Sequence, residues 1–149
     1  MKIKSLIIKE INKTIDAKTN SVQEMLQETI DSRDSDTKSS AGDKHETSRA
    51  KIQIEIDQLT KQLDLLNRQK QQLNSIDFSK KNHTASIGSL VKTNNGTYLI
   101  SIGFGKVIIE NEVFYAISSA SPIGRLFNNK LKGDKFIFRT INYEVVDIC

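Results

Sequence analysis

Residues 52–73 read IQIEIDQLTKQLDLLNRQKQQL. Along this segment apolar residues recur at alternating steps of four and three, with one lysine in the series. The positions are Ile52, Ile56, Leu59, Leu63, Leu66, Lys70 and Leu73. Such spacing is typical of the a and d positions of a heptad repeat, which share one face of a helix. The segment therefore predicts a helix over about 45–75 that buries this stripe against a second helix.

The second helix is predicted nearer the N-terminus, over about 5–33. Its stripe consists of Ile8, Ile11, Ile15, Val22, Met25 or Leu26, and Ile30, with the polar Lys18 interrupting it. An isolated amphipathic helix is marginal in water, so each stripe needs a partner to cover it. We expect an antiparallel coiled-coil hairpin over residues 1–80.

The segment between the two stripes, residues 31–44, is rich in Ser and Asp. These residues hydrogen-bond to nearby backbone and favour caps and turns, so the chain is expected to reverse here. The tip of the hairpin would lie near 34–43 and would carry Asp34, Asp36 and Asp43. Taken alone, a solvated turn whose aspartates cap helix ends is the simpler interpretation of these carboxylates.

The composition changes after about residue 84. Six of the seven glycines, the only proline and all three tyrosines lie in 84–149. Short apolar runs separated by turn signals such as Asn94-Asn95-Gly96 predict four to six strands. Ser121 followed by Pro122 predicts the start of a short helix, since Ser is a favoured N-cap and Pro suits the first helical position. The whole chain is expected to be α+β, with the hairpin followed by a small antiparallel sheet and one short helix.

Length, charge and cysteine content narrow the functional classes. A chain of 149 residues excludes a large multidomain enzyme, and the net charge of +4 is spread among residues of both signs, which does not favour nucleic-acid binding. No apolar run approaches the ~20 residues of a membrane span, and no signal sequence is recognisable. Cys149 is the single cysteine, which suits a reducing compartment. We expect a cytoplasmic protein with no membrane partner.

The run from Ile117 to Asp134, ISSASPIGRLFNNKLKGD, resembles the C-terminal domain of the Gre-type bacterial transcription elongation factors. That domain has an Ile-Ser strand end, a Ser-Pro-Leu helix start, a following Arg, and Gly-Asp before the next strand. Residues 87–91 and Tyr98 are similar to its first two strands. The resemblance covers about 84–149 at the level of sequence. It implies an FKBP-like α+β domain joined to a coiled-coil hairpin.

The resemblance also implies a partner, RNA polymerase. In such factors the globular domain docks at the rim of the polymerase secondary channel, and the hairpin tip passes inward toward the RNA 3′ end. The docking loop would correspond here to Ser121, Pro122, Gly124 and Arg125. The factor is expected to act as a monomer.

Residues 36–41, DTKSSA, are similar to the family's tip motif, Asp-Leu-Lys-Glu-Asn-Ala. Asp36 takes the place of the aspartate that coordinates Mg²⁺ in the polymerase active centre, and Asp43 is a second candidate. The protein would then be no enzyme itself and would have no cofactor of its own. It would supply carboxylates to magnesium shared with the polymerase, where two ions stabilise phosphodiester hydrolysis.

Ser39 stands where the tip motif has Glu, and a hydroxyl is a poorer magnesium ligand than a carboxylate. Two outcomes stay open, namely stimulation of transcript cleavage and occupation of the channel without cleavage. Two other classes also stay open: a coiled-coil interaction module unrelated to polymerase, and a small nucleic-acid-binding β domain. His45 beside the tip is read as a surface residue, with a metal or phosphate role as the less favoured alternative, and His83 is read as a residue of the connector.

Overall fold

The computed structural model describes the backbone of residues 2–36 and 42–149, and the side chains of 2–35 and 46–149. The described chain forms two compact units. One combines Met1–Lys13 with Gln71–Cys149, and the other is Thr14–Lys70. Each unit is described below by itself.

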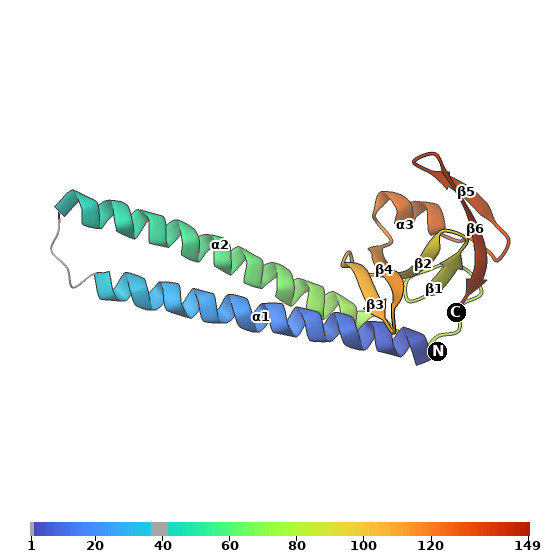
Figure 1. The fold of residues 1–149 in the computed structure, drawn as a ribbon, viewed down its shortest axis with the longest axis horizontal. Coiled ribbons are helices and arrows are strands. Elements are labelled where there is room, and N and C mark those ends of the chain that lie inside the picture. The colour runs from blue at the N-terminus through green and yellow to red at the C-terminus, as the bar shows by residue number, and fades with distance from the viewer. Residues whose placement is uncertain (1, 37–41) are drawn as a thin grey trace. The chain divides into compact units, whose positions relative to one another are not determined.

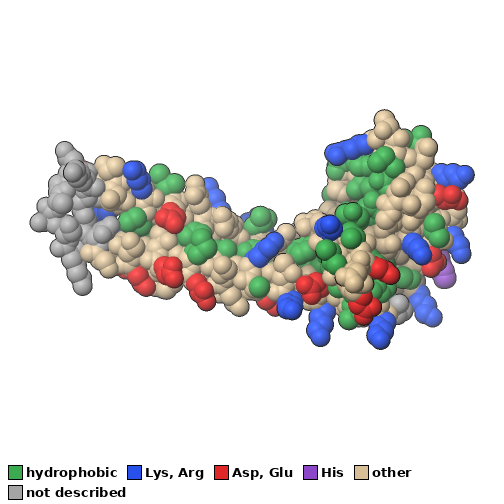
Figure 2. Space-filling model, viewed as in Figure 1, with side chains coloured by type: hydrophobic (Ala, Val, Ile, Leu, Met, Phe, Trp, Pro, Cys, Tyr) green, Lys and Arg blue, Asp and Glu red, His purple; other side chains and the backbone are tan. Residues whose placement is uncertain are grey.

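Two long helices make up the first half of the chain. Helix α1 spans Lys2–Asp36 and helix α2 spans Gly42–Ser75, which confirms both helices and extends each beyond its predicted start. Within Thr14–Lys70 they lie side by side and antiparallel (Figure 1). Lys70 Nζ forms an ion pair with Asp16 at 3.0 Å, and Arg33 Nη1 donates to Gln53 Oε1 at 3.5 Å. Charged side chains of both signs are spread along these helices (Figure 2).

The predicted stripes are largely the buried ones. In Thr14–Lys70, Ile15 and Val22 of α1 and Ile56 and Leu59 of α2 are buried. Leu26 is half-buried whereas Met25 is 47% exposed, so Leu26 is the stripe residue. Lys18 is exposed, in agreement with the predicted interruption.

The stripe is shifted by one residue near the start of α1. Ile7 is completely buried, whereas the predicted Ile8 is only half-buried. The prediction that Ile8 belongs to the buried stripe is therefore wrong, and Ile7 takes its place. Ile7, Ile11 and Lys4 follow steps of four and three, so the buried face near the start of α1 passes through Ile7.

The second half forms one six-stranded sheet and a short helix. The strands are β1 (Leu90–Thr93), β2 (Gly96–Ser101), β3 (Gly105–Ile109), β4 (Glu112–Ser118), β5 (Lys135–Phe138) and β6 (Ile141–Ile148). Their order in the sheet is β3-β4-β2-β1-β6-β5, and α3 (Pro122–Phe127) is the helix (Figure 1). The fold class is thus α+β, as predicted.

The prediction of a purely antiparallel sheet is wrong for one pair of strands. Strands β2 and β4 pair in parallel, with Tyr98 opposite Tyr115, whereas the other pairs are antiparallel. The cause is the placement of β4 between β2 and β3, since β3 reverses the chain and β4 then returns in the direction of β2. The sheet is therefore mixed.

The turn between β5 and β6 has an unusual residue composition. Arg139 and Thr140 alone connect β5 to β6, and both have a positive φ. Positive φ at both central residues is the geometry of a two-residue hairpin turn that normally selects Gly or Asn. Since neither residue type is present, local sequence could not reveal this turn.

One face of the sheet packs beneath α3. Its core contains Val91, Tyr98, Ile100, Phe127 and Val145, with Ala85, Phe136 and Tyr143 joining the same cluster. The ring of Tyr98 lies 5.0 Å from that of Phe127, and Phe127 lies 5.0 Å from Phe136. Aromatic pairs at such distances add to the burial energy, so these rings fix α3 on the sheet.

The other face carries Leu90, Leu99, Phe114 and Ala116, all buried. Ile3 of α1 lines a recess with Leu90 and Phe114, and the first turns of α1 belong to the same unit as the sheet. No helix among the described residues is both long enough and apolar enough to span a bilayer.

Candidate docking site

The sequence-predicted loop after β4 is built around the hydroxyl of Ser121. Ser121 Oγ accepts from the backbone N–H of Gly124 at 3.1 Å and donates to the carbonyl of Ser118 at 2.7 Å. Ser121 therefore caps α3 as predicted, and Pro122 occupies the first turn. A serine N-cap satisfies an otherwise unpaired donor and stabilises a helix by about 1 kcal/mol.

Gly124 is buried against the end of β4. A Cβ built on Gly124 would lie 2.0 Å from the carbonyl oxygen of Ser118 and 2.8 Å from Ser121 Oγ. Both neighbours are fixed by the cap, so no larger residue fits without moving the helix. Gly124 is thus a structural requirement of the loop.

The remaining two predicted docking residues are on the surface. Pro122 and Arg125 are exposed, one at the start of α3 and the other one turn later. Residues 122 and 125 are three apart, so they lie on the same side of a helix. All four predicted docking residues already lie within 121–125 of the sequence, and in the structure two support the loop and two face solvent.

A recess of about 460 Å³ lies next to this loop. Ser119, Gly124 and Asn128 line one part of it, and Ala85, Ser86, Ile87 and Ile100 line the rest. Ile87 is 56% exposed, although the sequence placed it in the first strand. The strand begins at Leu90 instead, because Gly88 has a positive φ and Ser89 Oγ donates to the carbonyl of Ser86 at 2.6 Å.

Sequence reasoning missed this recess. The one available signal was the pair Ser86 and Ser89 around Gly88, a combination typical of a side-chain-bonded turn. That turn places the exposed Ile87 beside α3, which extends the candidate docking site beyond Pro122 and Arg125.

The buried Tyr98 packs against Phe127 of α3, the helix that carries the candidate docking site. Tyr98 Oη donates to the carbonyl of Asn95 at 3.1 Å, and its ring stacks on Tyr115 at 5.3 Å. Burial, followed by the hydrogen bond with Tyr143, raises the pKa of Tyr98 above its usual range. Tyr98 therefore stays neutral at physiological pH and acts as a packing residue.

The side chains of the predicted tip residues Asp36 and Asp43 lie outside the described part of the chain. The backbone places Asp36 at the last position of α1 and Asp43 in the first turn of α2. Asp34 is described, and it is exposed and lies 3.4 Å from Arg33. Within the described residues, no group of three or more His, Cys, Asp or Glu side chains is arranged to hold a metal ion.

The chain was compared with protein-family models, with curated proteins and with solved structures, and no match was found.

Proposed function

We propose that this chain is a cytoplasmic regulator of transcription elongation that binds RNA polymerase. In this proposal the sheet domain has an FKBP-like fold and docks on the polymerase through the surface of Pro122 and Arg125. The coiled-coil hairpin then inserts its tip into the secondary channel. The support is the resemblance of residues 117–134 to Gre-type factors, together with an antiparallel helix pair followed by an α+β domain.

The observation that carries the proposal is that different residues of the capped loop hold it in place and face solvent. Ser121 and Gly124 are occupied in holding the loop, whereas Pro122 and Arg125 are exposed. A rigid loop that presents a proline and an arginine loses little conformational entropy on binding. Arginine is also enriched among the residues that dominate the energy of protein interfaces. These properties suit a docking element.

The tip would contribute chemistry only inside the partner. Magnesium held by the polymerase would activate the attacking water, as in other two-metal sites. Asp36 would add one carboxylate, with Asp43 as a second candidate. Because Ser39 replaces the glutamate of the family motif, cleavage is one outcome of the proposal and occupation of the channel without cleavage is the other.

Binding is tested first, with purified core polymerase at low salt and micromolar protein. We expect a complex that the double variant Pro122→Ala/Arg125→Glu weakens by at least about tenfold, as for a small group of central interface residues. Lys106→Glu is the charge-matched control, since Lys106 is exposed on β3 away from the loop in sequence. Absence of any complex with the wild-type protein would end the proposal.

Cleavage is tested separately, on a stalled and backtracked complex with Mg²⁺. If the tip stimulates hydrolysis, the wild-type protein shortens the RNA and Asp36→Ala abolishes this while leaving binding intact. If both proteins bind equally and neither releases a 3′ fragment, the regulator acts without cleavage.

One observation favours the alternative of a coiled-coil interaction module. In Thr14–Lys70, Leu65 is 60% exposed and lines a recess of about 410 Å³ with Val22 and Leu66. An exposed leucine on a helix pair suits a third helix. Leu65→Glu distinguishes the two functions, since it should abolish binding of a helical partner and leave binding through the Pro122 loop unchanged.

A further inference from the structure

Strand β5 is one edge of the sheet, because the order of strands ends there. Its only strand neighbour among the described residues is β6, with Lys135 opposite Glu144 and Ile137 opposite Asn142. The backbone N–H of Glu144 donates to Asn94 Oδ1 at 2.8 Å. The backbone carbonyl of Glu144 accepts from the backbone N–H of Asn94. Both backbone groups of Glu144 therefore point away from β5.

The direction of the β5 backbone follows from this geometry. In an antiparallel pair, residues that exchange hydrogen bonds alternate with residues that do not. Since the backbone groups of Glu144 bond to Asn94, the pairs Lys135–Glu144 and Ile137–Asn142 do not exchange hydrogen bonds with each other. Lys135 and Ile137 consequently direct their N–H and C=O groups to the free edge of the sheet.

The β6 side of this hairpin is held rigidly. The Asn94 side chain continues the sheet beyond the end of β1, with Nδ2 donating to the carbonyl of Asn142 at 3.3 Å. Asn95 Nδ2 donates to the same carbonyl at 2.9 Å. A strand added to β5 would thus meet a template that is already ordered, which lowers the entropy cost of binding.

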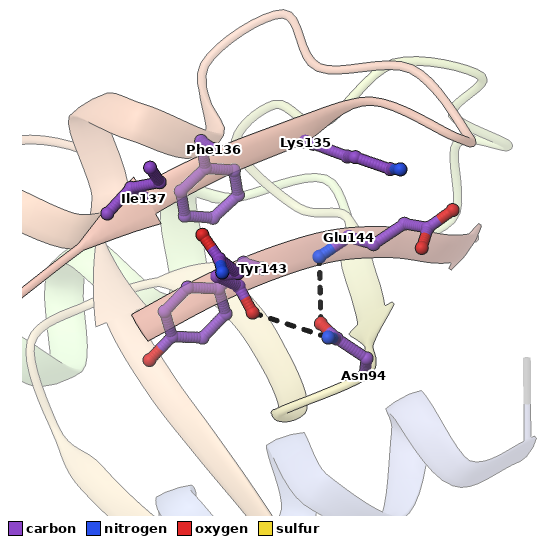
Figure 3. Close-up of a pocket in the computed structure, with 7 residues that line it drawn as sticks. Asn94, Lys135, Phe136, Ile137, Tyr143 and Glu144 are labelled. Carbon is purple, nitrogen blue, oxygen red and sulfur yellow. Dashed lines mark hydrogen bonds between the residues drawn. The ribbon is translucent and has the colours of Figure 1, made fainter. Parts of the chain in front are cut away.

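A recess of about 660 Å³ runs along the hairpin. Lys135 and Glu144 extend alongside each other at one end of it, whereas Ile137 lies at the other end (Figure 3). Ile137 is 66% exposed. An exposed β-branched side chain on a free edge is a feature that proteins usually avoid, because it invites strand pairing.

The charge of this edge indicates the kind of strand that fits. Residues 130–144 contain four basic residues and two acidic ones, Asp134 and Glu144, and Glu144 lies opposite Lys135. Lys135 and Arg139 are exposed, and Arg139 also lies over the ring of Phe138 at 5.0 Å. An added strand with acidic side chains would gain favourable cross-strand pairs with them.

A second copy of the chain fits less well. Two β5 strands pairing antiparallel about Ile137 would bring Lys135 of each copy toward Arg139 in the turn that follows β5 of the other. Like charges that face each other across a strand pair destabilise it. The same charges that attract an acidic strand therefore disfavour self-association through this edge.

We propose that the free edge of β5 accepts an extended, acidic segment of a partner protein as an additional strand. Backbone groups of Lys135 and Ile137 would provide the hydrogen bonds, the exposed Ile137 an apolar contact, and Lys135 and Arg139 the charge selectivity. Recognition by strand addition draws its affinity from main-chain hydrogen bonds and its specificity from alternate side chains. This inference does not depend on the proposed role in transcription.

The opposite edge offers a matched control. Strand β3 is the other end of the sheet, and its Ile108 is 56% exposed. Ile108 and Ile137 occupy equivalent positions, each one residue before the last residue of an edge strand that leads into a two-residue turn. The β3 edge differs in charge, since Glu110 and Glu112 follow it.

The test uses the full chain and a short peptide of alternating Glu and Val, with a Lys and Val peptide of equal length for comparison. Ile137→Pro removes an outward N–H and also the isoleucine side chain, whereas Ile137→Ala removes most of the side chain and keeps the N–H, so the two variants together separate these effects. Proline is tolerated at such positions of edge strands. We expect the acidic peptide to bind and to shift the amide resonances of β5. Ile137→Pro should weaken this binding by about tenfold or more if main-chain bonds carry it. Ile108→Pro should leave it unchanged, and thermal unfolding would verify that both variants fold.

Three results would overturn the inference. They are equal binding of the acidic and basic peptides, equal binding by wild type and Ile137→Pro, and a concentration-dependent dimer that Ile137→Pro abolishes. The last result would assign the edge to a second copy instead. A Lys135→Glu/Arg139→Glu variant should reverse the peptide preference if charge selects the strand.

Discussion

The ammonium Nζ of Lys4 lies 3.3 Å from the backbone carbonyl oxygen of Cys149, across 145 positions of sequence. The same carbonyl accepts from the N–H of Leu90 at 2.8 Å, where the end of β6 meets β1. Lys4 is only 1% exposed, so the first turn of α1 places a charged group against the sheet inside one compact unit. Lysine is almost never buried so completely unless it is paired.

Burial lowers the pKa of Lys4 below its usual value of 10.5, and attraction to Cys149 and Asp77 only partly opposes this effect. Below the lowered pKa the folded state bears the full cost of the buried charge. That cost is relieved as the pH rises from the lowered pKa toward 10.5, because the folded protein then binds fewer protons than the unfolded chain.

We therefore predict that Lys4→Met is at least as stable as the wild type at neutral pH. Removing a buried charge that has one long hydrogen bond relieves desolvation and keeps the packing volume. The advantage of Lys4→Met should shrink as the pH approaches 10.5. Urea unfolding of both proteins over this pH range checks the prediction, and a clearly less stable Lys4→Met at neutral pH would contradict it.

Gly124→Ala should destabilise the sheet domain by about 2 kcal/mol or more, since overpacking a fixed site typically costs 1–3 kcal/mol. Its Cβ would clash with the carbonyl oxygen of Ser118. Gly103→Ala is the control, because a Cβ there meets only the Cβ of Ser118 at 3.9 Å. Equal midpoints of urea unfolding for the two variants would show that α3 can move away from β4 at little cost.

Leu59→Ala should cost about 2–4 kcal/mol of stability, as for other buried leucines in cores. Leu59 belongs to the buried stripe of α2 and is 4% exposed. Leu65→Ala removes the same atoms from a side chain that is 60% exposed, and its effect should stay within about 0.5 kcal/mol. Thermal unfolding followed by circular dichroism compares the two. A similar loss in both would mean that the helices pack in a different register.

Asn94→Ala should destabilise the β5–β6 hairpin by about 1–2 kcal/mol, because the N–H of Glu144 and the carbonyl of Asn142 each lose a partner. Hydrogen exchange at the Glu144 amide should become faster. Asn94→Asp keeps the acceptor for Glu144 and should protect this amide better than alanine does. Unchanged exchange in Asn94→Ala would show that water replaces the asparagine without loss.

Local patterns in the sequence accounted for a large part of the fold. The heptad spacing from Ile52 to Leu73 predicted α2, and Ser121 with Pro122 predicted the start of α3. The Asn94-Asn95-Gly96 signal predicted the turn between β1 and β2, where Gly96 has a positive φ. In each case the physical cause acts over a few residues, so neighbouring sequence is sufficient.

The candidate site was predictable only in part. Ser121, Pro122, Gly124 and Arg125 were named as docking residues from the resemblance, and that role stays a prediction. Their division into supporting and exposed residues required atomic positions. The free β5 edge was not predictable, because which strand ends a sheet depends on pairing between distant segments. The chemistry of Asp36 stays a prediction from resemblance.

The sequence by itself determined the two helices, the α+β class and the capped loop, because periodicity, capping and turn formation are short-range effects. Tertiary structure alone decided that β2 and β4 pair in parallel and that Lys4 is buried beside Cys149. Both depend on segments far apart in the chain meeting at a particular register. There, the free energy gained by packing a whole face of the sheet outweighs the preference of any single residue.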